Sequence, residues 1–152
     1  MKRWLLAALL LAAFPVCAAP LHEGGWPAVL LAHAGQPVIV HVWGMTCAPC
    51  QVELPEWGKL RQERPSLALV LVEADPMPVK PERIGAVLAK AGLADAESWV
   101  LEDADERQRY EIDPAWGGEL PMTLLIGRDG KTVRILGAAD FNVVRQWLDT
   151  AG

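Results

Sequence analysis

Two cysteines separated by two residues provide the clearest chemical feature of this sequence. Cys47 and Cys50 lie where a run of strand formers, VIVHVW, gives way to a helical pattern. A CxxC pair at such a junction is typical of a redox site. Unpaired N–H groups and the dipole at a helix N-terminus stabilise a thiolate, which lowers the thiol pKa from its usual value of about 8.5. We therefore predict that Cys47 is the nucleophile and that Cys50 resolves the mixed disulfide.

Other chemistries for the cysteine pair are a zinc half-site, a metal chaperone or binding module, and a pair of inert thiols. A structural zinc ion needs about four ligands, and the sequence has no second CxxC pair. The three histidines, His22, His33 and His41, show no ligand spacing relative to the cysteines. We therefore expect no metal and no cofactor, with the two sulfur atoms carrying the electrons.

The first 18 residues have the pattern of a secretion signal. Lys2 and Arg3 precede an apolar run over residues 4–14, and Val16 and Ala18 occupy the −3 and −1 positions of a cleavage site. We expect residues 1–18 to be removed, with an uncleaved N-terminal anchor as the alternative. This pattern predicts a periplasmic or otherwise extracytoplasmic protein.

Length and charge restrict the function further. A chain of 152 residues favours one domain. The whole chain has 14 basic and 19 acidic residues, and loss of Lys2 and Arg3 would leave 12 against 19, a net charge of −7. This acidity argues against nucleic-acid binding. The third cysteine, Cys17, lies in the expected leader, so the mature chain would keep only the CxxC pair. We expect a monomer.

Hydrophobic patterning predicts an α/β domain. Residues 19–35 are expected to form a linker and a short helix, with Pro27 in its first turn. A strand over Val38–Trp43, a helix over 47–63 and a strand over 67–72 form a βαβ unit. The later elements are a helix starting at Pro81, a strand at 98–101, a helix at 105–112, a hairpin of Met122–Ile126 with Thr132–Leu136, and a helix after Asp140.

This order of elements resembles the thioredoxin fold, and the details resemble the TlpA-like thioredoxins of bacterial envelopes. The matching segments are VIVHVWG, CAPC with Glu53 and Pro55 in the following helix, LPMT, and IGRDG. The resemblance extends from about residue 36 to the C-terminus, and residues 80–116 fit the family's additional helix and strand. It implies a thioredoxin-like domain over residues 36–152, with a central mixed β-sheet, helices on both faces and a TlpA-like αβ insert.

The resemblance also implies roles for residues outside the CxxC pair. Pro121 should be cis and lie beside the disulfide, and Leu120 should offer backbone hydrogen bonds to an extended partner. Glu53 should lie under the disulfide, tune the thiol pKa values and move protons to and from Cys50. The alternative for Glu53 is an ordinary solvated side chain on the helix surface.

The sequence departs from the family pattern at two positions. Thr46 stands where the family has a tryptophan before the first cysteine, which leaves partner choice open. His41 stands where thioredoxin itself has a buried aspartate. His41 is either a proton-handling group below the disulfide or a hydrogen-bonded histidine of the core. Trp116 similarly either packs in the core or lines a partner groove ahead of Pro121.

The resemblance implies a thiol–disulfide oxidoreductase that acts on protein thiols and disulfides. We expect a reductase, as in cytochrome c maturation, supplied by a membrane electron donor because NADPH is not available outside the cytoplasm. An oxidase or isomerase on the same fold is the alternative. The direction of electron flow depends on the relative stability of the two redox forms, which the Ala48-Pro49 pair does not fix.

Overall fold

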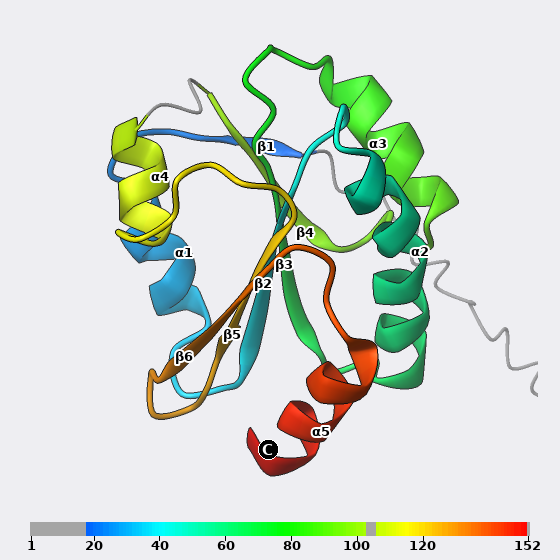
Figure 1. Cartoon of the computed structure of the whole chain (residues 1–152), viewed down its shortest axis with the longest axis vertical. Coiled ribbons are helices and arrows are strands. Elements are labelled where there is room, and N and C mark those ends of the chain that lie inside the picture. The colour runs from blue at the N-terminus through cyan, green and yellow to red at the C-terminus, as the bar shows by residue number, and fades with distance from the viewer. Residues whose placement is uncertain (1–17, 103–105, 152) are drawn as a thin grey trace, which may run out of the picture.

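The computed structural model describes residues 18–102 and 106–151. Within these residues, six strands form one sheet with helices on both faces (Figure 1). The strands are β1 (Ala19–Leu21), β2 (Val38–Trp43), β3 (Ala68–Glu73), β4 (Glu97–Leu101), β5 (Met122–Ile126) and β6 (Thr132–Leu136). The helices are α1 (Trp26–Ala32), α2 (Ala48–Glu63), α3 (Pro81–Lys90), α4 (Glu106–Ile112) and α5 (Phe141–Ala151).

The central strand β2 carries the chain directly to the CxxC motif. All six residues of β2 are buried, because both faces of the sheet are covered at this position. The strand order is β1-β4-β3-β2-β5-β6, with β2 parallel to β3 and antiparallel to β5. The expected βαβ unit is therefore confirmed, with α2 as the connection between two parallel strands.

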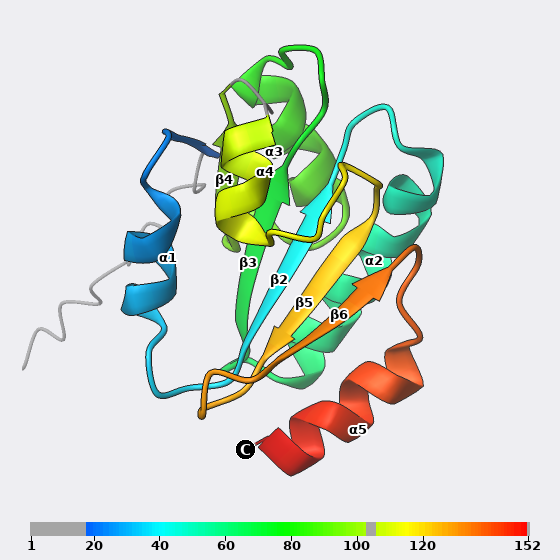
Figure 2. The ribbon, with the colours of Figure 1, turned by 60° about the vertical axis from the view of Figure 1, so that its left-hand side comes forward.

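Side chains alternate between two hydrophobic cores on the two faces of the sheet. Ile39 and Trp43 of β2 pack on the face that α2, α3 and α5 cover. Val38, Val40 and Val42 pack on the opposite face, which α1 and α4 cover. Figure 2 shows these two helical layers on either side of the twisted sheet. Elements on the α2 face can therefore reach the region directly behind the cysteines.

The C-terminal hairpin and helix complete the α2 face. Gly130 has a φ of 77° in the turn between β5 and β6, a conformation that favours glycine. The side chain of Asp140 accepts a hydrogen bond from the N–H of Asn142 at 2.8 Å, as expected for a residue that caps α5. Val144 and Leu148 of α5 then pack into the same core as Trp57 of α2.

The N-terminal part of the domain differs from the sequence-based expectation. Residues 19–25, expected to form only a linker, contain β1, which pairs in parallel with β4 at the edge of the sheet. A strand of three residues is too short to show a hydrophobic period, so the sequence pattern gave no signal for it. The expected secretion signal lies outside the described residues except for Ala18, as does residue 105 of the expected fourth helix. Within residues 18–102 and 106–151, no helix has the length and apolar character needed to cross a bilayer.

Candidate active site

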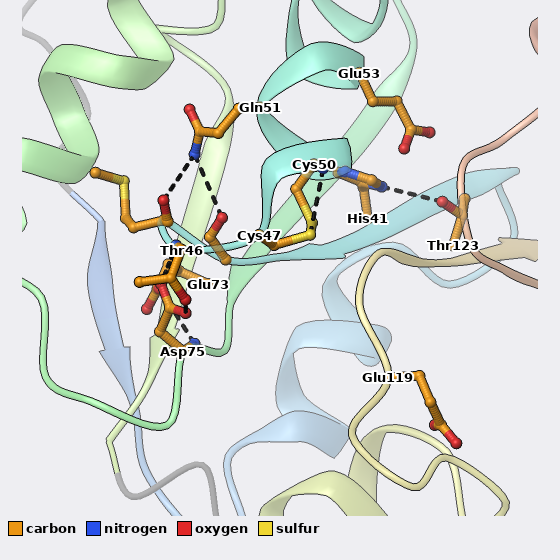
Figure 3. The surroundings of a disulfide bond; sticks show 12 residues. His41, Thr46, Cys47, Cys50, Gln51, Glu53, Glu73, Asp75, Glu119 and Thr123 are labelled. Atoms are coloured by element: carbon orange, nitrogen blue, oxygen red, sulfur yellow. Dashed lines mark hydrogen bonds between the residues drawn. A yellow bond between two sulfur atoms is a disulfide. The ribbon is translucent and has the colours of Figure 1, made fainter.

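Cys47 and Cys50 form a disulfide at the start of α2 (Figure 3). Their sulfur atoms are 2.04 Å apart and their Cα atoms 5.2 Å apart. Cys47 is partly exposed beside the exposed Ala48 and Pro49, whereas Cys50 is fully buried. An outside sulfur atom can therefore reach Cys47, while Cys50 is accessible only from Cys47.

The N-terminus of α2 is arranged to stabilise negative charge on Cys47. Cys47 is the N-cap residue, and its Sγ accepts a hydrogen bond from the backbone N–H of Cys50 at 3.3 Å. After reduction of the disulfide, this N–H and the helix dipole would favour the thiolate over the thiol at Cys47. Cys50 lies inside the first turn and is surrounded by the core. Solvent cannot stabilise a thiolate there, so burial favours the neutral thiol at Cys50.

The loop before Cys47 is held from the side of α2. The side-chain amide of Gln51 donates hydrogen bonds to the carbonyl oxygens of Gly44 and Met45, at 3.3 and 3.5 Å. The N–H of Cys47 bonds to the carbonyl of Gly44 at 3.3 Å. These contacts fix the turn that presents the nucleophile.

Pro121 lies at the end of β2 from which this loop departs. The Leu120–Pro121 peptide bond is cis. Val42 pairs with Met122, so the antiparallel register places Pro121 beside Trp43 and Leu120 beside Gly44. The Leu120 side chain is so near that its Cδ1 would lie 3.0 Å from a Cβ on Gly44. Among the described residues, no hydrogen bond uses the backbone of Leu120.

Glu53 is a buried carboxyl on the same face of α2 as Cys50, one turn further along. Its side chain is 5% exposed, and its Oε1 accepts a hydrogen bond from the N–H of Ala139 at 3.0 Å. Its other oxygen, Oε2, is buried without a hydrogen-bond partner among the described residues. Burial raises the pKa of Glu53, an effect that the Ala139 N–H partly offsets. The structure thus places Glu53 inside the protein and not on a solvated helix face.

His41 lies in the core behind the disulfide. Its Nδ1 is hydrogen-bonded to the hydroxyl of Thr123 at 3.0 Å, and its ring lies 5.1 Å from that of Trp57. Burial lowers the pKa of His41 to about 3, so the imidazole is neutral at ordinary pH. These contacts fit the core-histidine interpretation. A proton-handling role, which would use the unpartnered Nε2, stays a prediction.

The residue before the nucleophile has a hydrogen-bonding role that the sequence did not reveal. The N–H of Thr46 donates to Asp75 Oδ2 at 3.0 Å, and the Thr46 hydroxyl donates to Oδ1. Asp75 itself lies beside Glu73, and both carboxyls are buried, with exposures of 5% and 1%. The expected strand ended at residue 72, so Glu73 and Asp75 had the pattern of a solvated loop. In the structure Glu73 is the last residue of β3. A glutamate that continues an apolar strand is the signal that could have found this pair.

Trp116 packs in the core below the loop that leads to Pro121. It is 5% exposed, and its indole N–H donates to the carbonyl oxygen of Glu119 at 2.8 Å. Its position thus fits core packing and not the wall of a partner groove. The Glu119 side chain is held by the N–H of Gly117 at 3.0 Å and points away from the disulfide (Figure 3).

The described part of the chain contains no cluster of three or more histidine, cysteine, aspartate or glutamate side chains that could hold a metal ion. His22 and His33 lie in the N-terminal segment, where they pair with Glu102 and Glu97, at 2.6 and 2.8 Å. The structure brings Cys47, Cys50, Glu53, His41 and the Leu120–Pro121 bond to one end of the sheet. His22 lies at the edge of that same end, beside Glu102 after β4, whereas His33 lies at the opposite end, beside Glu97 at the start of β4.

These features define the thioredoxin fold, with an additional helix and strand, α3 and β4, between β3 and the final hairpin. No model of a known protein family matches the sequence. No curated protein matches it either. Solved structures do match, and their sequence identities of 13–23% to this chain establish similarity of fold.

Three solved structures illustrate the similarity. A secreted disulfide oxidoreductase of Mycobacterium tuberculosis, homologous to Escherichia coli DsbE, has a TM-score of 0.63 and 16% identity, covering 90% of this chain and 96% of its own. A putative thiol:disulfide interchange protein DsbE from Chlorobium tepidum has a TM-score of 0.59 and 22% identity, covering 80% and 84%. StoA from Bacillus subtilis has a TM-score of 0.59 and 21% identity, covering 77% and 85%. At the level of the fold, the expected likeness to TlpA-like thioredoxins is confirmed.

Proposed function

We propose that this protein is an extracytoplasmic thiol–disulfide oxidoreductase that reduces disulfides in other proteins. The observation that carries the proposal is the Cys47–Cys50 disulfide at the N-terminus of α2, with one sulfur accessible and the other buried. The names of the structural neighbours, which include a secreted disulfide oxidoreductase and a thiol:disulfide interchange protein, support the same activity.

The first step would use Cys47 as the nucleophile. In the reduced protein, the Cys47 thiolate attacks one sulfur of a partner disulfide. A bond forms between Cys47 and that sulfur, the partner's S–S bond breaks, and the second partner sulfur leaves as a thiolate that takes up a proton. The N–H of Cys50 and the helix dipole favour the thiolate needed for this attack.

The second step would use Cys50 and Glu53. Cys50 gives its proton to the Glu53 carboxylate and attacks Cys47, which releases the partner as a second thiolate and restores the Cys47–Cys50 disulfide. Two electrons have then passed to the partner. A raised pKa suits Glu53 to this exchange, because it brings the carboxyl closer to the pKa of the thiol. Because burial keeps His41 neutral, Glu53 would be the group that takes up the Cys50 proton.

The partner would bind as an extended segment along the Leu120–Pro121 bond. The backbone of Leu120 has no hydrogen-bond partner among the described residues and lies next to the loop that presents Cys47. A main-chain contact of this kind accepts many sequences. Thr46, smaller than the tryptophan of the family pattern, leaves room beside Cys47 for a bulkier partner surface.

Cysteine variants test the proposal. Cys47→Ser should abolish reduction of a peptide disulfide, whereas Cys50→Ser should accumulate a mixed disulfide visible by mass spectrometry. Full activity of either motif variant would contradict the proposal.

A redox titration against glutathione tests the direction. Proteins of this kind range from about −120 mV for strong oxidants to about −270 mV for reductants. We expect a value near the reducing end, with electrons supplied by a membrane protein and delivered in the periplasm. A potential near −120 mV would instead support the oxidase or isomerase.

A further inference from the structure

We propose that Glu73, paired with Asp75 behind the active-site loop, keeps a proton, and that this proton keeps Cys47 reactive by sparing it a second nearby negative charge. This inference rests on the proposed thiol–disulfide chemistry and adds two positioning residues to it.

The two carboxyls form a buried pair. Glu73 is the last residue of β3, and its side chain lies on the α2 face of the sheet, two positions after Leu71. Glu73 Oε1 accepts a hydrogen bond from the N–H of Asp75 at 3.2 Å. Two ionised carboxylates this close and this buried would repel each other strongly, so one of them retains its proton.

The proton belongs to Glu73. Asp75 accepts two hydrogen bonds from Thr46, one from the backbone and one from the hydroxyl, so both of its carboxyl oxygens already act as acceptors. Burial, followed by the hydrogen bond and negative charge of Asp75, raises the pKa of Glu73 to about 7. Glu73 is therefore mostly protonated below about pH 7 and mostly ionised above it.

The pair is connected to the nucleophile through one residue. Thr46 immediately precedes Cys47, so the Asp75 contacts fix the backbone that leads into α2 (Figure 3). Gly44 allows this approach, because a Cβ there would lie 3.0 Å from Asp75 Oδ1. The loop is thus held by Gln51 from the helix and by Asp75 from the end of β3.

Other charges near the pair are exposed. Trp43 of β2 and Val100 of β4 flank Glu73 in the sheet, and neither carries a charge. At the same end of the molecule, Lys80 and Glu82 begin α3 and Glu102 follows β4, and all three are exposed. Among the described residues, Asp75 is the one charged neighbour that shifts the pKa of Glu73.

Ionisation of Glu73 should therefore disfavour the Cys47 thiolate. For two charges taken to be about 10 Å apart at an effective dielectric constant of about 30, the ratio of Cys47 thiolate to thiol falls about sixfold. Coupling between two sites is reciprocal, so reduction of the disulfide should also raise the pKa of Glu73. The redox potential should then show an additional inflection around neutral pH.

Glu73→Gln tests this directly, because glutamine imitates the protonated carboxyl. The test follows the Cys47 thiolate by its ultraviolet absorbance in the reduced protein, over a range of pH. Above pH 7, the ratio of Cys47 thiolate to thiol at a given pH should be about sixfold higher in the variant than in wild type, and below pH 6 the two ratios should match. Glu82→Gln, which removes the same charge from an exposed site, should follow wild type. Equal profiles for wild type and Glu73→Gln would overturn the inference.

A measurement on the wild-type chain covers the possibility that the variant does not fold. Carbon-13 NMR of the glutamate carboxyls should show one that titrates near pH 7 in the oxidised protein and at higher pH in the reduced protein. The Glu53 carboxyl, which also titrates above its usual range, is identified by its loss in Glu53→Gln. Should every other carboxyl titrate below pH 5.5 in both forms, the inference is wrong. Loss of disulfide exchange in the wild type would instead contradict the proposed function.

Discussion

Replacement of His41 by asparagine should change how the stability of the oxidised protein depends on pH. His41 is fully buried, and burial lowers its pKa from 6.5 to about 3. A histidine that is neutral when folded binds a proton more readily when unfolded, so acid favours the unfolded state. Asparagine is neutral throughout and can still donate a hydrogen bond to Thr123.

The size of the effect follows from these two pKa values. Stability is fully present above the unfolded pKa of 6.5 and is lost as the pH falls toward 3. At pH 5, which is about 1.5 units below the unfolded pKa, protonation of the histidine stabilises the unfolded state by about 2 kcal/mol. This figure is the same for any folded pKa below about 4, so it depends mainly on the burial of the ring.

Urea unfolding at pH 8 and pH 5 measures this difference. The loss of stability from pH 8 to pH 5 should be about 2 kcal/mol smaller in His41→Asn than in wild type. The variant will have a constant cost from lost packing, which cancels in the comparison. An identical loss in His41→Asn and wild type would refute the claim that burial keeps His41 neutral.

Two further predictions concern α2. Glu53→Gln should slow the release of a mixed disulfide by about 100-fold, because it removes the acceptor for the Cys50 proton. In wild type the release rate should increase as the pH rises through the elevated pKa of Glu53, and the variant should lose this increase. Stopped-flow measurements with a chromogenic thiol follow both rates. Gly58→Ala should lower the free energy of unfolding by about 3 kcal/mol or more, because the new Cβ would lie 1.9 Å from the carbonyl oxygen of Ala91. Gly85 lies in α3, and a Cβ there would contact nothing within 4 Å. Gly85→Ala should therefore raise the free energy of unfolding by about 0.5–1 kcal/mol. Equal effects of the two alanine variants in thermal unfolding would contradict the packing argument.

Most of the fold could be predicted from the sequence because most of its helices and strands have a recognisable local pattern of residues. The run Val38–Trp43 has no polar alternation apart from His41, which predicted a strand covered on both faces, and all six residues are buried. Pro81 predicted the first residue of α3. β1 was missed, since its pairing with β4 joins residues about 80 positions apart and leaves no pattern in a segment of three residues.

The candidate site was predictable where residue type and spacing restrict the chemistry. The CxxC spacing at a strand-to-helix junction required Cys47 and Cys50 to be neighbours, and they form a disulfide. The cis bond before Pro121 was expected from resemblance and is present. Whether Glu53 was buried or solvated depended on α5 and the loop before it, which cover that face of α2 and supply the Ala139 N–H.

The sequence alone determined that two thiols would meet at the start of a helix, because neighbours three positions apart are brought together by local backbone geometry. Only the tertiary structure decided which ionisable groups would surround them. Glu73, Asp75 and Thr46 come from segments about 30 residues apart, and they meet because β2 and β3 lie side by side in the sheet. Burial and the charge of a neighbour are properties of that packing, so the protonation state of Glu73 and the neutrality of His41 are set by the fold and not by the order of residues.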